Sequence, residues 1–437
     1  TLGATGDSIN LASGATQSGF GRTGTVDWQT GDIKTATFTA ANGEGYFANT
    51  SGGAFTVNLP AGVAGAIVSF ADYAGTWQTN NVTVAPNGTD KIGSVNADVS
   101  LNTEGQSVTF VFVDSTQGWI NTMDSTSNVR AASFVTATVS GACNTLVTAP
   151  CCANTKIATF TGPGTFCVSA IASSPTNNVV SYLVVAGGGS GGSGNVGGGG
   201  GAGGYREVKS PVTPYTASPL DGYGTPGNRI TVTAQAYSIA VGGGGPTPNG
   251  NGNPSTFSSI TSTAGGAGRG GATTGNTGGS GGGGGEGGGG GGAGNTPPVS
   301  PPQGRPGGTS PSTRGGGGGG ADGPGCSGTP GPGGGGIGTG TQINPAAGTP
   351  GPSGPLKYFA GGGGGGSYKC GSYTPSGPGG YGGGGAGAVG GPGDTAGVAG
   401  TDNTGGGGGG TGYTAGPSAG GAANGGSGIV IIRYKFQ

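Results

Sequence analysis

The chain has 437 residues, of which 118 are glycine and only 7% are charged, and its formal net charge is -1. So few charges exclude nucleic-acid binding by phosphate neutralisation, which needs clustered Lys and Arg. The sequence contains no histidine, the commonest general base and metal ligand, and it has no run of 18 apolar residues that would predict a membrane-spanning helix.

Residues 1–125 are predicted to be all-β, because short apolar segments alternate with turn residues and no helical period is present. The stretch "AFTVNLP" places Phe55, Val57 and Leu59 on one face of a strand. Further strands are expected in "GAIVSFADY", "NNVTVAP" and "QSVTFVFVD", and the last is long enough to be buried on both faces. The tryptophans are expected in the core or at a subunit contact: Trp28, Trp77 and Trp119.

Residues 126–185 are predicted to form a second, smaller β region, with strands in "ASFVTATVSG", "KIATFTG", "TFCVSAI" and "VVSYLVVAGGG". Four of the six cysteines lie in this region. Their even number favours disulfides, while free thiols and a zinc site remain alternatives. Adjacent cysteines pair poorly with each other, so partners within the region are favoured, and the last two cysteines would close a glycine-rich loop. The disulfide candidates are Cys143, Cys151, Cys152, Cys167, Cys326 and Cys370.

Residues 186–437 hold 97 of the 118 glycines, in runs separated by short inserts rich in Pro, Thr, Asn and Tyr. A flexible linker would join two bodies, but the chain ends one strand after the last run, in "SGIVIIRYKF". Chains without Cβ atoms can pack closely enough for their backbones to hydrogen-bond to each other. We therefore predict a domain of packed polyglycine II helices, bracketed by β-strands, in which Glu286 faces solvent.

Two parts of the sequence resemble known structural proteins of phages. The segment from Gly43, with "GEGYF", "NLP", "ADY", "TWQTNNV", "EGQ" and Trp119, is similar to a β module of marine T4-like phages, cyanophages included. The combination "SYLVVAGGGSGG", "GGYRE", "YSIAVGGGG" and "GGSGIVIIRY" resembles the glycine-rich domain of phage tail fibres and tail-fibre adhesins. In the best understood relatives, polyglycine II helices form a sandwich whose tip loops bind the host receptor.

These resemblances imply a non-enzymatic virion protein, a tail fibre or a fibre-tip adhesin. The expected partners are other virion proteins, two further copies in a homotrimer, and a host cell-surface glycan or outer-membrane protein. No cofactor, metal, nucleic acid or membrane insertion is expected. The start at Thr1 indicates a processed N-terminus or a fragment.

Receptor contacts are expected in the aromatic and charged inserts of the glycine-rich half, because tyrosine offers a rigid amphipathic surface that stacks on sugars. The alternative is that these aromatics cap the glycine-rich packing. Two alternative functions also stay open: a purely structural capsid or tail decoration, and a secreted ice-binding or matrix protein. The candidate receptor-binding residues are Tyr215, Tyr223, Lys357, Tyr358, Phe359, Tyr368, Lys369 and Tyr373.

Overall fold

The structure is a computed structural model that divides the chain into two compact units, residues 1–131 and 132–437. It describes residues 26–125, 133–150, 152–311, 313–329, 331, 333–368, 375–390, 395–413 and 421–437. The described chain is all-β, with two short 3-10 helices, η1 (Pro175–Asn178) and η2 (Pro226–Asn228). In this part of the chain no helix is long and apolar enough to cross a membrane.

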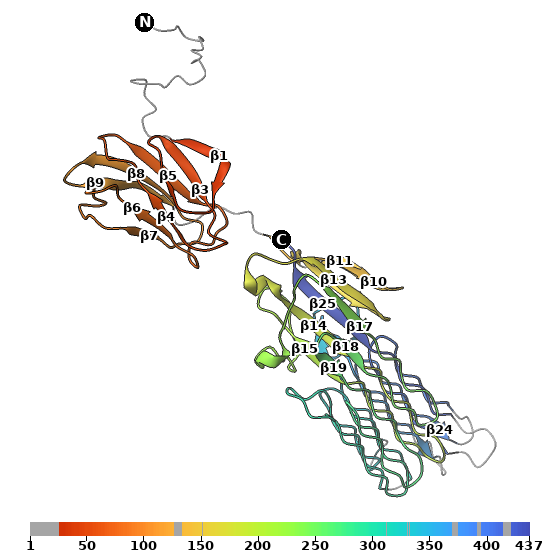
Figure 1. Cartoon of the computed structure of the whole chain (residues 1–437). Helices are drawn as coiled ribbons and strands as arrows, with labels where there is room; N and C mark the ends of the chain where they lie inside the picture. Colours follow the sequence, from red (N-terminus) through yellow and green to blue (C-terminus); the bar gives the residue numbers. More distant parts are fainter. Residues whose placement is uncertain are drawn as a thin grey trace. The chain divides into compact units, whose positions relative to one another are not determined.

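The first unit is a short β-solenoid in which three successive turns of chain each place one strand in each of two sheets (Figure 1). The strands within these turns pair in parallel, and the last three strands close the sheets in antiparallel fashion. One sheet has the order β1 (Asp27–Lys34), β3 (Glu44–Ala48), β5 (Ile67–Asp72), β8 (Ser107–Asp114), β9 (Gly118–Ser125). The other has the order β2 (Phe38–Thr39), β4 (Phe55–Asn58), β6 (Val82–Ala85), β7 (Val99–Leu101).

The core of the first unit lies between its two sheets and confirms the alternation predicted for β4. Val57 and Leu59 are fully buried, and Phe55 is 9% exposed. Trp77 and Trp119 are also fully buried, whereas Trp28 is 39% exposed and lies against Phe47 with ring centroids 5.0 Å apart. Two of the three tryptophans are therefore core residues, and the third lies at the surface.

The second unit begins with two packed sheets. The first has the order β10 (Thr136–Ser140), β13 (Gly164–Ala170), β17 (Ala236–Ala240), β18 (Ser255–Phe257), β19 (Ile260–Ser262). The second has the order β11 (Thr145–Ala149), β12 (Cys152–Phe160), β25 (Ile429–Lys435), β14 (Val179–Val185), β15 (Tyr205–Val208), and β16 (Ile230–Thr231) pairs with β14. The strands that bracket the glycine-rich region are thus immediate neighbours, since β25 lies between β12 and β14 and is antiparallel to both.

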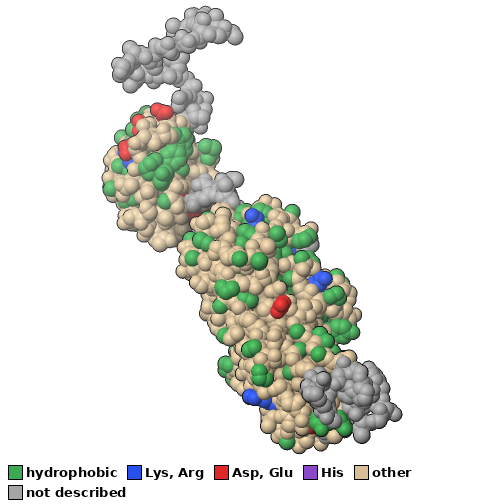
Figure 2. Space-filling view, turned by 90° about the vertical axis from the view of Figure 1, so that its right-hand side faces the viewer, with side chains coloured by type: hydrophobic (Ala, Val, Ile, Leu, Met, Phe, Trp, Pro, Cys, Tyr) green, Lys and Arg blue, Asp and Glu red, His purple; other side chains and the backbone are tan. Residues whose placement is uncertain are grey.

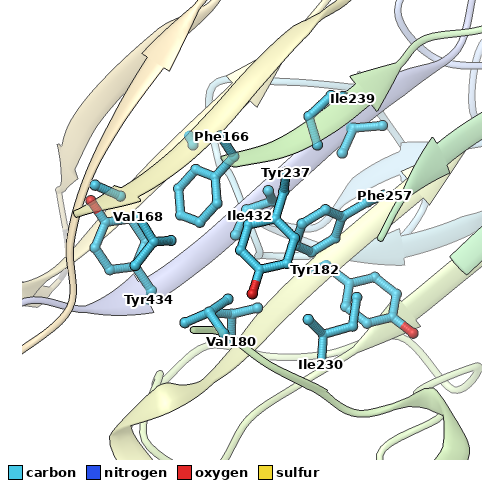
Figure 3. Packing of buried hydrophobic residues seen from close by; sticks show 14 of the residues in the cluster. Phe166, Val168, Val180, Tyr182, Ile230, Tyr237, Ile239, Phe257, Ile432 and Tyr434 are labelled. Atoms are coloured by element: carbon cyan, nitrogen blue, oxygen red, sulfur yellow. The ribbon is translucent and has the colours of Figure 1, made fainter. Parts of the chain in front are cut away.

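Aromatic residues fill the space between these two sheets. Figure 3 shows Phe166 and Phe257 of one sheet facing Tyr182 and Tyr434 of the other. Phe166 lies edge-on to Tyr434, with ring centroids 5.6 Å apart, and Phe257 lies edge-on to Tyr182 at 6.0 Å. This packing makes the two sheets a firm base from which the glycine-rich segments extend.

The glycine runs continue directly from the strands and lie side by side along the second unit (Figure 1). We call the packed glycine runs between β14 and β25 the glycine lattice. At the end near the two sheets it carries a small sheet of β20 (Thr339–Thr341), β22 (Lys357–Phe359) and β21 (Thr349–Pro350). At the opposite end, the tip, β23 (Ser367–Tyr368) pairs with β24 (Val389–Gly390).

Run 197–204 shows the hydrogen-bond pattern of the lattice. Its successive N–H groups donate to three neighbouring runs in rotation, and each neighbour recurs every third residue. Gly197 and Gly200, for example, donate to the carbonyl oxygens of Thr411 and Gly408 at 2.9 and 2.8 Å. The run donates to 263–269, 316–319 and 405–411, and its carbonyl oxygens accept from 189–192, 280–283 and 363–366.

Close packing explains why these positions are glycine. A Cβ atom at Gly199 would lie 2.0 Å from the carbonyl oxygen of Gly363, and one at Gly200 would lie 2.1 Å from that of Gly189. Such distances are shorter than any real carbon–oxygen contact, and the obstacle is backbone that other hydrogen bonds hold in place. These positions of the lattice therefore require glycine.

Candidate functional site

The tip of the lattice consists of turns that are far apart in sequence and bonded to each other through their backbones. The N–H of Glu286 donates to the carbonyl oxygen of Val196 at 3.1 Å. The turn that follows Glu286 is joined to Ser310 by two bonds of 2.8 Å: the Gly288 N–H donates to the Ser310 carbonyl oxygen, and the Ser310 N–H donates to that of Gly289. The hydroxyl of Thr411 donates to the carbonyl oxygen of Asn195 at 2.7 Å.

These turns enclose a shallow pocket of about 340 Å³, lined by Asn195, Glu286, Thr313, Tyr368 and Tyr413. We call it the tip pocket. Tyr368 and Tyr413 are half-buried and meet edge to face, with ring centroids 4.8 Å apart and an angle of 73° between the rings. Asn195 and Thr313 are exposed at its rim, and Glu286 is half-buried. The expectation that Glu286 stands where the glycine packing opens to solvent agrees with this position in a turn.

The predicted receptor-binding residues do not form one site, because those that the structure describes lie partly at the tip and partly beside the two sheets. Tyr368 lines the tip pocket, whereas Lys369 and Tyr373 lie outside the described residues. Residues 357–359 form β22 near the two sheets, where Tyr358 is 7% exposed and Phe359 is fully buried in the core. Phe359 therefore has the packing role that was the alternative to receptor contact, and Lys357 beside it is half-buried.

Tyr215 and Tyr223 also lie beside the two sheets and away from the tip. Both are half-buried, and each carries an arginine over its ring: Arg433 lies 5.2 Å from the Tyr215 centroid and Arg229 lies 4.3 Å from that of Tyr223. Contacts of this kind hold the rings against the base of the unit.

A buried polar cluster explains why the "GGYRE" element stands out in the sequence. The Glu207 side chain is 2% exposed, and its carboxylate accepts hydrogen bonds from the Tyr205 and Thr341 hydroxyls, each at 2.6 Å, and from the Ser218 N–H at 3.0 Å. Burial raises the pKa of the Glu207 carboxyl, and these donors oppose the rise. The cluster thereby fastens the insert after β15 and strand β20 to the base of the unit.

Arg433 of β25 fastens the same inserts from the other side. Its guanidinium is fully buried and donates to the carbonyl oxygens of Pro214 at 2.8 Å and Ile343 at 3.3 Å. The polar residues of both sequence elements that flank the glycine runs thus anchor inserts, and they do not form an open site.

In the first unit, Asp72 of the "ADY" motif also holds turns together through hydrogen bonds. The buried Asp72 carboxylate accepts hydrogen bonds from the N–H groups of Gly75 at 2.8 Å, Thr76 at 3.2 Å and Gly105 at 2.9 Å. Asp72 thereby joins the turn before Trp77 to the "EGQ" turn. The "ADY" and "EGQ" motifs therefore have a structural role, because they connect two turns of the first unit.

The predicted disulfides are not seen among the described residues. Cys143, Cys167 and Cys326 are exposed free thiols, so Cys143 and Cys167 are not paired with each other. Cys143 occupies a turn, whereas Cys167 lies on β13 opposite Thr138 of β10. The Cys152 thiol donates to the carbonyl oxygen of Pro214 at 3.5 Å. Cys151 and Cys370 lie outside the described residues.

Charged side chains are scattered on the face of the second unit shown in Figure 2. Throughout the described chain, no three His, Cys, Asp or Glu side chains are grouped as ligands of a metal ion.

The comparisons with known proteins agree with the architecture of the second unit. The model of the glycine-rich domain family matches residues 161–435, from the end of β12 to the last residue of β25. The search of curated proteins gives no match to the chain. Because the family model spans more than half of its residues, the chain belongs to the glycine-rich domain family.

Proposed function

We propose that the chain is a non-enzymatic structural protein of a phage particle, a tail fibre or fibre-tip adhesin that contacts the host cell surface with the tip of its glycine lattice. The observation that carries this proposal is the tip pocket. It places two tyrosines and a carboxylate at the end of the lattice opposite the two sheets, beside β24. Binding residues are commonly found on loops that a rigid scaffold positions.

In this proposal the lattice is a bundle of polyglycine II helices. The support is the recurrence of each hydrogen-bonded neighbour at every third residue, since polyglycine II has three residues per turn. The six neighbours of run 197–204 correspond to hexagonal packing of such helices. A bundle of this kind satisfies its backbone internally and needs few side chains to hold a tip in place.

We further propose that the first unit attaches the chain to other virion proteins and joins it into a homotrimer. Its outer surface includes large apolar side chains that suit a protein contact, with Trp28 39% and Met123 60% exposed. Sedimentation of the full chain tests this part, since a monomer at micromolar concentration would contradict the trimer.

Adsorption to cells tests the proposed function. Fluorescently labelled full chain is incubated with a panel of marine cyanobacterial strains, and bound label is measured after washing. We expect adsorption to a subset of strains, competed by excess unlabelled chain. Adsorption to none of them would favour a purely structural decoration, and the adhesin proposal would then be abandoned.

A further inference from the structure

We infer that the tip pocket binds a saccharide, with the sugar ring seated on Tyr368 and Tyr413 and its polar groups held by Glu286, Asn195 and Thr313. This inference rests on the proposed function and names the class of ligand that the tip would recognise. Four of these five residues were not singled out as receptor contacts by the sequence.

Tyr368 and Tyr413 form an apolar corner of the tip pocket, in which their two rings are the walls. Because Tyr368 and Tyr413 meet at 73° with centroids 4.8 Å apart, they present a ring face and a ring edge at nearly a right angle. Both rings are half-buried, so their orientation is fixed while part of each remains open. The aliphatic C–H face of a pyranose packs well on such a surface, and the phenol hydroxyls remain available to its polar edge.

The rim supplies hydrogen-bonding groups of both kinds. The Glu286 carboxylate, the Asn195 amide and the Thr313 hydroxyl line the same pocket, and within the described structure their side chains have no hydrogen-bond partner. A carboxylate accepts from two hydroxyls, and an amide both donates and accepts. A polyhydroxylated ligand can satisfy all three groups, whereas an apolar ligand would leave them unpaired.

Backbone pairing and hydrogen bonds at the tip hold the pocket residues in place without a ligand. Tyr368 belongs to β23, and both Tyr368 and Tyr413 are tied by backbone bridges to neighbouring runs. Asn195 and Glu286 are fixed through the bonds of their turns to Thr411 and Val196. Because this framework is already ordered, little conformational entropy is lost on binding.

Charge narrows the class of sugar. Among the described residues that line the pocket, Glu286 is the one that carries a charge, and its carboxylate favours neutral and amino sugars over acidic ones. An ammonium group on the sugar would pair with this carboxylate and would also be attracted to the tyrosine faces.

Saturation-transfer NMR on the full chain tests the inference, with N-acetylglucosamine, glucosamine and N-acetylneuraminic acid as neutral, cationic and anionic probes. We expect binding of the first two and none of the third. Tyr368→Ala and Tyr413→Ala should each weaken binding at least about fivefold, because each removes one wall of the corner. Tyr73→Ala, which removes an exposed tyrosine of the first unit, is the matched control and should leave binding unchanged.

Glu286→Gln tests the role of charge, because it keeps the shape of the side chain. It should weaken glucosamine binding more than N-acetylglucosamine binding and remove the salt dependence of the former. Thermal unfolding of each variant shows whether the unit is still folded.

Two results would overturn the inference: binding of none of the three probes at millimolar concentration, or unchanged binding in both tyrosine variants with the fold intact. Cell adsorption without sugar binding would refute the inference and leave the proposed function standing. Sugar binding without adsorption to any strain would refute the proposed function and leave the inference standing.

Discussion

At the scale of single residues, the glycine lattice depends on positions that have no Cβ atom. Gly199 and Gly200 occupy positions where a Cβ atom would overlap the carbonyl oxygen of a neighbouring run. Ordering glycine costs more backbone entropy than ordering any other residue. Here that cost is offset by hydrogen bonds that the close approach of backbones permits. Other glycines, such as Gly243 at the surface of the lattice, have open space around them.

This difference predicts a contrast between two alanine variants. Gly200→Ala should lower the free energy of unfolding of the second unit by at least about 2 kcal/mol, because a rigid backbone cannot move aside. Gly243→Ala should change it by less than about 1 kcal/mol, since the nearest atom to the new Cβ is the Asn253 amide nitrogen at 3.7 Å. Denaturant unfolding of both variants measures the contrast, and equal stabilities would show that Gly200 is not in a close-packed run.

The buried Glu207 predicts a pH dependence of stability. Its pKa in the folded protein is raised above the ordinary 4.5. The contribution of Glu207 to the free energy of unfolding is therefore fully present below pH 4.5. It is lost as the pH rises through the folded-state pKa. Glu207→Gln cannot ionise, so the wild type should lose stability relative to this variant as the pH rises from 4.5 through the folded-state pKa. A constant difference in the free energy of unfolding over that range would mean that the carboxyl titrates as in the unfolded chain.

At the scale of elements, periodicity predicted strands well where one face is buried. The strands expected in "AFTVNLP", "GAIVSFADY", "NNVTVAP" and "QSVTFVFVD" are β4, β5, β6 and β8. The strand β11 was not predicted, and the stretch that follows Arg229 between the glycine runs forms two strands, β16 and β17. The parallel pairing of the solenoid was also missed, because alternation reports which face of a strand is buried and not which strand lies beside it.

The central place of β25 predicts that the second unit cannot fold without its C-terminal strand. Removing residues 429–437 would leave β12 and β14 without the partner that lies between them, and would expose the faces that pack on Ile431 and Ile432. We expect this variant to lose the calorimetric transition of the second unit and to keep that of the first. Retention of both transitions would show that β25 contributes little to the second unit.

At the scale of the whole molecule, composition indicated that the glycine runs form structure, but it could not indicate which runs are neighbours. The tip pocket illustrates this limit, since its residues come from five separate segments, at 195, 286, 313, 368 and 413. Only the connectivity of the lattice brings them together, and no local motif marks them. Tyr368 was found because tyrosines in inserts were considered, whereas Tyr413 and Glu286 as pocket residues required the structure.

Hydrogen exchange of the backbone amides in the glycine runs tests the central claim most directly. In glycine-labelled full chain, the glycine amides of 197–204 and 281–285 should exchange at least about a thousandfold more slowly than in an unfolded peptide, since each is bonded within the lattice. Exposed turn glycines such as Gly287 should exchange quickly and serve as the internal control. Exchange of the run amides at unfolded-peptide rates would mean that the glycine runs are a tether and not a lattice.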